Sequence, residues 1–225
     1  MSSTVLETAL PALWLVRHGE STWNSAGLAQ GHNDEAELTE RGRRQAADAA
    51  AQFGYRPARA IYASDLRRAR QTAAAFAEVL GLPVYTDPRL RERSLGVLEG
   101  TAHQGIGPAA TGLADGLVID PDVRPEAGES VRDLYVRAAA FCDDLVAGLR
   151  DGHGPLPGLT RTGPASATSA SAGGDVLVIA HGGPVRVLDA YLHGVPVDQM
   201  TWRPVDNATI VRISEFGTAL RGGTR

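Results

Sequence analysis

Two stretches of this sequence end an apolar run on a histidine that glycine follows. In LWLVRHGESTWN, Arg17 and His18 come directly after Leu13–Val16, and VLVIAHGGPVR reaches His181 and Gly182 in the same way. An imidazole can act as a nucleophile, an acid or a base near neutral pH. An arginine side chain presents a planar fork of donors that matches phosphate oxygens. These residue types together are typical of a site that binds and transfers a phosphoryl group.

A third group of cations lies in the segment SDLRRARQT, where Arg67, Arg68 and Arg70 follow Ser64. Arginines and the N–H groups of glycine turns and helix N-termini both bind phosphate. Each feature has an ordinary alternative, because a histidine at a strand end is often structural and arginines at a helix start are usually solvated. The three groups together favour a common anion site over three unrelated surface features.

The elements that must position these side chains follow from the apolar pattern. We predict strands at Ala12–Val16, Ala60–Ala63, Val84–Thr86, Val176–Ala180 and Thr209–Ile213, and helices at Glu40–Phe53, Leu66–Leu80, Val131–Leu149 and Pro184–Leu192. Ser130 and Asp133 predict a capping box at the start of the third helix. Alternating strands and helices indicate an α/β fold with a mostly parallel sheet. Ligands bind beyond the carboxyl ends of such strands, where the cations above would converge.

Composition limits the class of protein. A net charge of −4 over 225 residues does not indicate a nucleic-acid or anionic-membrane partner. Cys142 is the only cysteine, so disulfides within the chain and cysteine-based zinc sites are excluded. No apolar run approaches the ~20 residues of a membrane span, and the N-terminus has no signal-peptide pattern. These features fit a cytoplasmic protein, and they do not indicate an oligomeric state.

Two regions lack a regular pattern. Thr101–Gly128 is rich in glycine, alanine and proline and predicts an irregular excursion over the sheet. Residues 152–174 contain the tract GPASATSASAGG and predict a flexible, low-complexity surface loop. We expect this loop to lie within one domain that covers residues 1–225.

The motifs resemble those of a known family. LVRHGESTWN resembles the N-terminal signature of the histidine phosphatase superfamily, the phosphoglycerate-mutase-like group (branch 1). The segments SDLRRARQT, LRERSLGVLEG, EAGESVRDL and VIAHGGPVRVL are similar to its later signatures, in the same order, from Leu13 to Ile213. The resemblance implies a three-layer sandwich with a mostly parallel central sheet and helices on both faces.

The resemblance also implies roles for single residues. His18 is the expected nucleophile, which forms a phosphohistidine, and Glu92 the expected acid and base. The residues expected to hold the phosphoryl oxygens are Arg17, Asn24, Arg68, His181 and the amide of Gly182, and those expected to contact the rest of the substrate are Trp23, Gln30, Gly31 and Glu129. No metal and no cofactor are expected. A competing interpretation makes Glu92 a carboxylate that is paired with Arg91 and Arg93.

The superfamily contains mutases and phosphatases. Mutases of this group carry an arginine-rich insertion after the acid motif, whereas Thr101–Gly128 contains only Arg124. We therefore predict a phosphomonoester hydrolase that acts on a small phosphorylated metabolite and releases inorganic phosphate. The alternatives are a cofactor-dependent phosphoglycerate mutase and a non-catalytic phosphate-binding module on the same fold. The presence of Glu92 argues against the binding module, which needs no acid.

Overall fold

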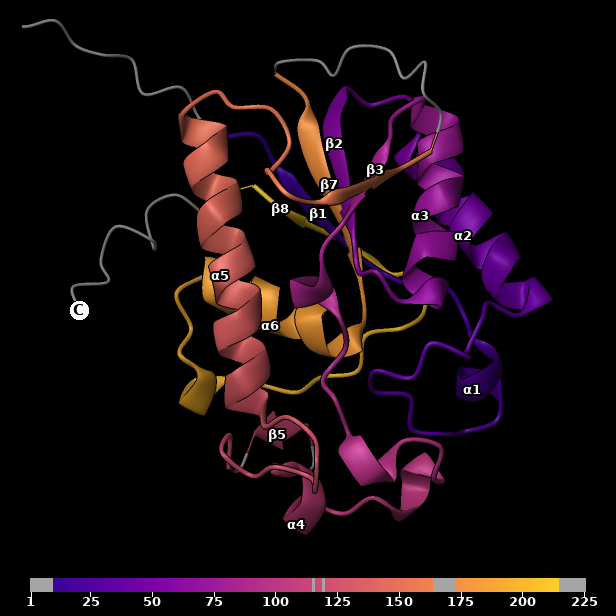
Figure 1. Cartoon of the computed structure of the whole chain (residues 1–225), viewed down its shortest axis with the longest axis vertical. Coiled ribbons are helices and arrows are strands. Elements are labelled where there is room, and N and C mark those ends of the chain that lie inside the picture. The colour runs from indigo at the N-terminus through magenta and orange to yellow at the C-terminus, as the bar shows by residue number, and fades with distance from the viewer. Residues whose placement is uncertain (1–9, 115, 119, 164–172, 215–225) are drawn as a thin grey trace, which may run out of the picture.

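A six-stranded sheet forms the middle layer of the molecule in the computed structural model, which describes residues 10–114, 116–118, 120–163 and 173–214 (Figure 1). Its strands, in spatial order, are β6 (Thr160–Thr162), β3 (Val84–Thr86), β2 (Ala58–Ala63), β7 (Asp175–Ala180), β1 (Leu13–Arg17) and β8 (Ile210–Ile213). The four inner strands are parallel, and the two edge strands β6 and β8 are antiparallel to their neighbours.

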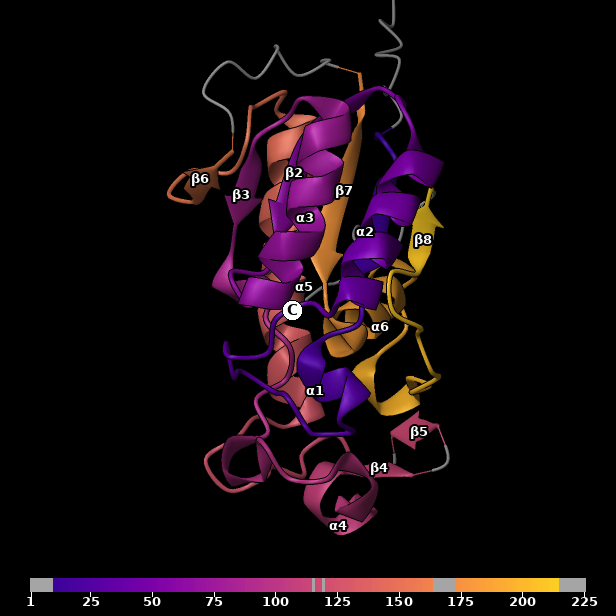
Figure 2. The same cartoon turned by 90° about the vertical axis from the view of Figure 1, so that its right-hand side faces the viewer.

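Helices cover both faces of this sheet (Figures 1 and 2). One face carries α2 (Glu40–Phe53) and α3 (Arg67–Leu80), and the other carries α5 (Val131–Arg150) and α6 (Gly182–Leu192). Successive strand residues point to opposite faces. Leu13 and Leu15 accordingly join the core under α5 and α6, whereas Val16 joins the core under α2 and α3. The predicted three-layer α/β sandwich is confirmed.

The predicted helix starts are within two residues of those observed, and they are exact where a side chain caps the helix, at Thr39 and Ser130. Ser130 and Asp133 form the predicted capping box at the start of α5, with Ser130 Oγ accepting from the Asp133 N–H. Leu66 is the residue before α3, so this helix begins one residue later than predicted. His181 has an extended backbone and ends the strand segment, so α6 begins at Gly182, two residues earlier than predicted.

The edge strand β6 falls inside residues 152–174, where we predicted only a surface loop. Its three residues are exposed and polar, and antiparallel backbone pairing with β3 holds them, so no apolar pattern marks the strand. Leu156 lies nearby, is only 9% exposed, and donates its N–H to the Tyr62 hydroxyl. Residues 164–172, which include most of the low-complexity tract, lie outside the described residues.

Short elements connect the main ones around the carboxyl ends of the strands. They are α1 (Thr22–Ser25), α4 (Pro108–Thr111), the hairpin of β4 (Leu113–Ala114) and β5 (Leu117–Val118), and single 3-10 turns at Pro88–Leu90, Gly96–Leu98, His103–Gly105 and Val197–Gln199. The described part of Thr101–Gly128, predicted to be irregular, contains α4, the β4–β5 hairpin and one 3-10 turn, which irregular segments join. It lies beyond the strand ends and not over a face of the sheet, which corrects the predicted position (Figures 1 and 2).

Candidate active site

The register of two adjacent strands brings the two histidines together. β1 and β7 pair in parallel with Arg17 opposite Ala180, so His18 and His181 are the next residues on neighbouring strands. The His18 N–H donates to the Ala180 carbonyl at 3.0 Å, and the two imidazole centroids are 5.0 Å apart. The convergence that the two His-Gly sequences predict is therefore a direct result of strand pairing.

His18 is buried, with 2% of its surface exposed, and not at the rim of the cleft as its position after a strand suggests. Its Nδ1 lies 2.7 Å from the Gly19 carbonyl oxygen. Because a carbonyl only accepts, Nδ1 carries the proton and Nε2 keeps the lone pair. Burial, and then the charges of Arg68 and Arg17, hold the pKa of His18 well below its usual value. His18 is thus a neutral imidazole at physiological pH, with the lone pair of Nε2 free to act as a nucleophile.

His181 is fully buried beside His18, and a residue at the end of β2 contacts its side chain. Its Nε2 lies 2.9 Å from the hydroxyl of Ser64, the residue directly after that strand. Burial and the nearby charge of Arg68 lower the pKa of His181 well below its usual value. Its Nδ1 is buried without a hydrogen-bond partner.

Arg17 and Arg68 bring two guanidinium groups to the histidines. Arg68 is fully buried and donates from Nη1 to the Asn33 carbonyl at 2.8 Å and from Nη2 to the Gly31 carbonyl at 2.9 Å. Arg17 donates to the Val205 carbonyl. Burial lowers the pKa of both groups, that of Arg68 to about 10. Buried charges are normally paired, so their position without an ion pair among the described residues favours a bound anion.

Three buried nitrogens in the described structure lack a hydrogen-bond partner, and all three belong to this group. They are Arg17 Nε, Arg68 Nε and His181 Nδ1. A buried polar atom without a partner costs about 1–3 kcal/mol, and such atoms are rare in native proteins. They lie on the end of β1 (Arg17), directly after β7 (His181) and in the first turn of α3 (Arg68). Their concentration at one place is what a site for a multiply charged oxyanion requires.

Glu92 approaches the same place from the segment after β3. Its Oε1 accepts from the Arg93 N–H at 2.8 Å, and its Oε2 accepts from the Gly183 N–H at 3.1 Å. A Cβ on residue 183 would lie 2.1 Å from Glu92 Oε1, so only glycine permits this approach. The second glycine of the sequence His-Gly-Gly thus makes room for the carboxylate.

The alternative interpretation of Glu92 as an ion-paired carboxylate is not supported. Arg91 makes a two-pronged pair with Asp65, at 2.7 and 2.6 Å. Arg93 donates from Nη1 to the Thr111 carbonyl at 2.9 Å. Within the described parts of the chain, no arginine forms an ion pair with Glu92, which leaves the carboxylate available to the cleft.

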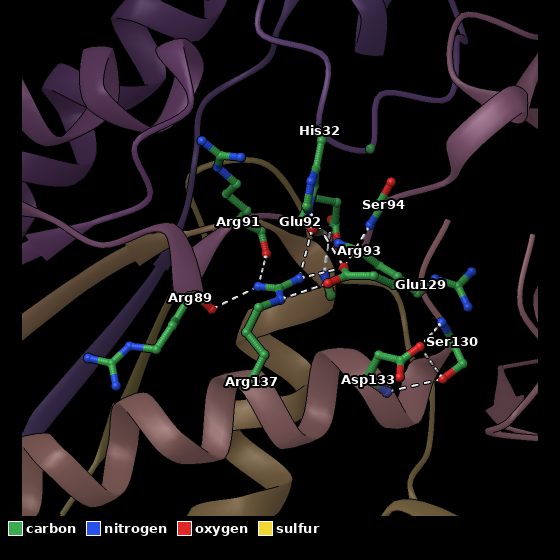
Figure 3. Close-up of polar contacts among 12 residues, drawn as sticks. His32, Arg89, Arg91, Glu92, Arg93, Ser94, Glu129, Ser130, Asp133 and Arg137 are labelled. Carbon is green, nitrogen blue, oxygen red and sulfur yellow. Dashed lines mark hydrogen bonds and ion pairs between the residues drawn. The ribbon is translucent and has the colours of Figure 1, made fainter. Parts of the chain in front are cut away.

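A polar network behind Glu92 fixes its backbone (Figure 3). Arg137 of α5 donates to the carbonyls of Arg89, Arg91 and Glu92, at 2.8, 2.9 and 3.1 Å. The same guanidinium pairs with Glu129, which also accepts from the Ser94 N–H at 2.9 Å. One helix residue thereby ties together the three carbonyls that lead to and include Glu92.

These residues surround a cleft of about 660 Å³ at the carboxyl ends of the strands. Of the residues predicted for the site, Arg17, His18, Asn24, Gln30, Gly31, Arg68, Glu92 and Gly182 line it. His181 lies buried against His18. Asn24 is held by Asn207, which donates to the Asn24 side-chain oxygen at 3.2 Å and to the His18 carbonyl at 3.1 Å. The wall opposite the strands includes His103, Gln104 and Ile106.

Besides the buried His181, four residues that the sequence analysis singled out do not line the cleft. Trp23 lies against Gly100, 3.5 Å from the position of a Cβ there. Glu129 belongs to the network behind Glu92. Arg67 and Arg70 pair with Glu37 and Asp34 on the outer side of α3. Helical geometry explains the last two, because neighbours along a helix point about 100° apart and only Arg68 of the three points inward.

The cleft also contains residues that sequence reasoning missed. Arg93 and Arg186 line it, together with four residues of the 202–206 segment: Trp202, Pro204, Val205 and Asp206. The spacing in the sequence could have identified Arg186. It stands four residues after Gly182, and therefore on the same face of a helix that begins at the site. The 202–206 segment is irregular and precedes an edge strand, and no pattern in its residue types distinguishes it from other loops.

The described residues contain neither a metal-binding cluster nor a membrane-spanning helix. No group of three or more histidine, cysteine or acidic side chains is arranged to hold a metal ion in this part of the chain. No helix within it combines the length and the apolar character needed to cross a membrane.

Comparisons with known proteins point to one family. The chain matches the histidine phosphatase superfamily (branch 1) over residues 13–154 and 163–220. It is 35% identical over 188 residues to a glucosyl-3-phosphoglycerate phosphatase of Mycolicibacterium vanbaalenii, covering 83% of this chain and 76% of that protein. It is 32% identical over 202 residues to a Yersinia pestis protein named "Probable phosphoglycerate mutase", covering 89% and 83%.

Solved structures agree with these sequence matches. The mycobacterial glucosyl-3-phosphoglycerate phosphatase in complex with VO3 superposes with a TM-score of 0.72 at 33% identity, covering 90% of each chain. The same enzyme with inorganic phosphate gives a TM-score of 0.68 at 32% identity, covering 90% of this chain and 88% of the other. The ordered motifs, the sheet topology and these matches confirm the resemblance: this chain belongs to branch 1 of the histidine phosphatase superfamily.

Proposed function

We propose that this protein hydrolyses the phosphomonoester of a small phosphorylated metabolite through a phosphohistidine on His18. The observation that carries the proposal is a neutral, buried imidazole, His18, whose Nε2 keeps its lone pair. His18 lines the cleft beside two arginines that lack an ion pair among the described residues. Splitting a displacement into two steps through such a nucleophile is ordinary covalent catalysis. The charge of the transferring group then needs fixed cations, which Arg17 and Arg68 supply.

In the first step, the phosphoryl oxygens bind Arg17, Arg68, His181 and the Gly182 N–H. His18 Nε2 attacks phosphorus, the P–N bond forms, and the ester P–O bond breaks. Glu92, in its protonated form, gives its proton to the leaving oxygen. The Gly19 carbonyl supports this step because it holds the proton of Nδ1 while positive charge develops on the ring.

In the second step, Glu92 acts as a carboxylate and takes a proton from water. The water oxygen attacks phosphorus, the P–N bond breaks, and inorganic phosphate leaves. His18 returns to its neutral form and Glu92 to its protonated form, so the two steps balance. The arrangement needs no metal ion, because arginine and histidine side chains and a helix N-terminus supply the positive potential.

Hydrolysis is favoured over mutase activity by the segment that lies beyond the strand ends. Arg124, the single arginine of Thr101–Gly128, pairs with Asp133 at the start of α5 and does not line the cleft. That segment thus supplies no arginine clamp for returning the phosphoryl group to a bound substrate. The matches to phosphatases support the same activity. We place the enzyme in the cytoplasm, where its single, buried Cys142 stays reduced.

The test combines trapping and inhibition. Acid-labile, base-stable label from ³²P-labelled substrate is expected on wild-type histidine and not on His18→Ala, and turnover of p-nitrophenyl phosphate is expected to survive EDTA and to be inhibited by vanadate. Circular dichroism verifies that His18→Ala folds. Label that persists without His18, or activity lost in EDTA and restored by Mg²⁺ or Zn²⁺, contradicts the mechanism. Exchange of 2- and 3-phosphoglycerate without phosphate release favours the mutase, and binding without turnover favours the binding module.

A further inference from the structure

Arg186 places a further guanidinium in the cleft, in addition to the two that the proposed chemistry uses. It stands on α6 one turn after Gly182 and lines the cavity. Its Nη1 lies 2.9 Å, and Arg17 Nε lies 3.8 Å, from the position that a Cβ on residue 182 would take. The two guanidinium groups therefore border the same space, which stays open because residue 182 is glycine.

The side chain of Arg186 is held so that its terminal nitrogens stay available. Its Nε donates to the Arg203 carbonyl, and its guanidinium lies over the Trp202 ring, 4.9 Å from the centroid. A cation over an aromatic face is attracted by the negative potential of the ring. Among the described residues, no carboxylate forms an ion pair with Arg186. The chain thus orients this guanidinium without pairing it with a carboxylate among the described residues.

The charges around the cleft leave an excess for a ligand. Four arginines line it (Arg17, Arg68, Arg93 and Arg186), against the two carboxylates Glu92 and Asp206. Arg93 is turned to the Thr111 carbonyl, and Asp206 is exposed. In the proposed mechanism, Arg17 and Arg68 bind the transferring phosphoryl group. Arg186 therefore remains as a fixed, oriented cation next to the phosphoryl position.

We propose that Arg186 binds a carboxylate carried by the substrate on the carbon skeleton next to its phosphoester. This inference rests on the proposed function, since it places the phosphoryl group at Arg17 and Arg68. The planar guanidinium fork fits a carboxylate with two parallel hydrogen bonds. The substrate class is then the phosphorylated hydroxy acids, and the single subsite on α6 takes the place of a clamp from Thr101–Gly128.

The experiment compares two substrates that differ only at the proposed contact. 3-Phosphoglycerate carries a carboxylate where glycerol 3-phosphate carries a hydroxymethyl group. Wild-type enzyme is expected to prefer 3-phosphoglycerate at least tenfold in kcat/KM. Arg186→Gln is expected to raise KM for 3-phosphoglycerate about 10- to 100-fold, as for the loss of a hydrogen-bonded charge. KM for glycerol 3-phosphate and for p-nitrophenyl phosphate is expected to change less than threefold, about the scatter of such measurements.

Arg203→Gln is the matched control, because it removes the same charge from an exposed neighbour that does not line the cleft. It is expected to leave the substrate preference unchanged. Arg186→Lys keeps the charge without the fork and is expected to restore part of the preference.

Two outcomes overturn the proposal. Equal losses on all three substrates in Arg186→Gln assign the residue to the transferring phosphoryl group, and no loss on any of them removes it from binding. If Arg186→Gln does not fold, the wild-type preference decides, since its absence also contradicts the carboxylate subsite. The proposed function is judged separately, by wild-type turnover of p-nitrophenyl phosphate and by label on His18.

Discussion

Two groups of arginines lie on opposite sides of Glu92 and differ in their partners. Arg17 and Arg68 face the cleft and form no ion pair among the described residues. In the second group, Arg91 pairs with Asp65. Arg137 pairs with Glu129 behind Glu92 (Figure 3). Carbonyl groups and carboxylates satisfy the second group, whereas the first keeps buried nitrogens without partners.

The difference separates two uses of the same residue type. A guanidinium with a carboxylate and several carbonyls builds structure, because its charge is neutralised and its donors are used. A buried guanidinium without a carboxylate is unfavourable in the empty protein, and an anionic ligand supplies the missing partner. The partner of each arginine therefore indicates whether a substitution changes activity or stability.

The largest effect is expected at Arg68. Arg68→Gln removes a fixed charge from the transferring phosphoryl group, and arginines in that role contribute about 10³–10⁵-fold to kcat. We expect kcat on p-nitrophenyl phosphate to fall by that order. Arg91→Gln, which removes the same charge behind Glu92, is the matched control and is expected to change kcat only a few-fold. Similar losses in both variants contradict the distinction between the two groups.

A smaller effect is expected at Glu92, between the two groups. Glu92→Gln keeps the shape of the side chain but cannot transfer a proton, and general acid–base catalysis is typically worth about 10²–10⁴-fold. Turnover of an alkyl phosphate is expected to fall by that order. The loss on p-nitrophenyl phosphate is expected to be smaller, because its leaving group needs little protonation. Equal losses on both esters assign Glu92 to water activation or to structure.

A substitution of Arg137 tests the second group of arginines, those that are paired with carboxylates. Arg137→Gln breaks the three bonds to the carbonyls of Arg89, Arg91 and Glu92 and leaves Glu129, which is partly buried, without its cation. Unfolding in urea is expected to show a loss of about 1–3 kcal/mol. Arg137→Gln with Glu129→Gln is expected to recover part of it, because no unpaired carboxylate remains. kcat is expected to fall more than KM rises, since Glu92 loses its position and the phosphate ligands do not.

Arg132 is the control for Arg137 on the same helix. It pairs with Asp122 and Asp198 at the exposed surface. Exposed pairs contribute about 0–1 kcal/mol, so Arg132→Gln is expected to leave both stability and kcat nearly unchanged. A loss of stability in Arg132→Gln as large as that in Arg137→Gln would show that burial and partner number do not decide the effect.

The smallest effect concerns pH. Burial and the cleft arginines hold the pKa of His18 and of His181 well below 6.5 in the folded protein. Below pH 6.5 the unfolded chain therefore binds more protons at these residues than the folded chain does, so stability falls as the pH decreases. Above pH 6.5 both histidines are neutral in the folded and the unfolded chain, so they cause no loss of stability there. Unfolding in urea at pH 8, 6 and 5 is expected to show this slope, and His18→Gln is expected to flatten it.

Much of the fold follows from the sequence. Buried parallel strands are continuous runs of branched residues, and this pattern locates the segments of β1 and β7 to within one residue at each end. Helix starts follow from local capping groups, as at Ser130. The edge strand β6 does not follow, because backbone pairing alone forms it.

Of the candidate site, the sequence by itself determined which residues stand directly after the strands. His18, Arg17 and His181 follow apolar runs that only a sheet interior accommodates, and parallel pairing brings such ends to one edge. Arg68 belongs to the same group through its motif, although the sequence does not separate it from Arg67 and Arg70.

Only the tertiary structure decided the direction and the partners of the other side chains. Glu129 pairs with Arg137, while Arg186 keeps its terminal nitrogens in the cleft. Sequence reasoning assigned Glu129 to substrate contact and did not select Arg186, so it identified the use of neither residue. The physical reason is that a charged side chain is defined by what surrounds it, and those neighbours come from strands and helices that are distant along the chain. Local pattern fixes where a residue lies on its own element, and packing between elements decides whether its charge is neutralised or left for a ligand.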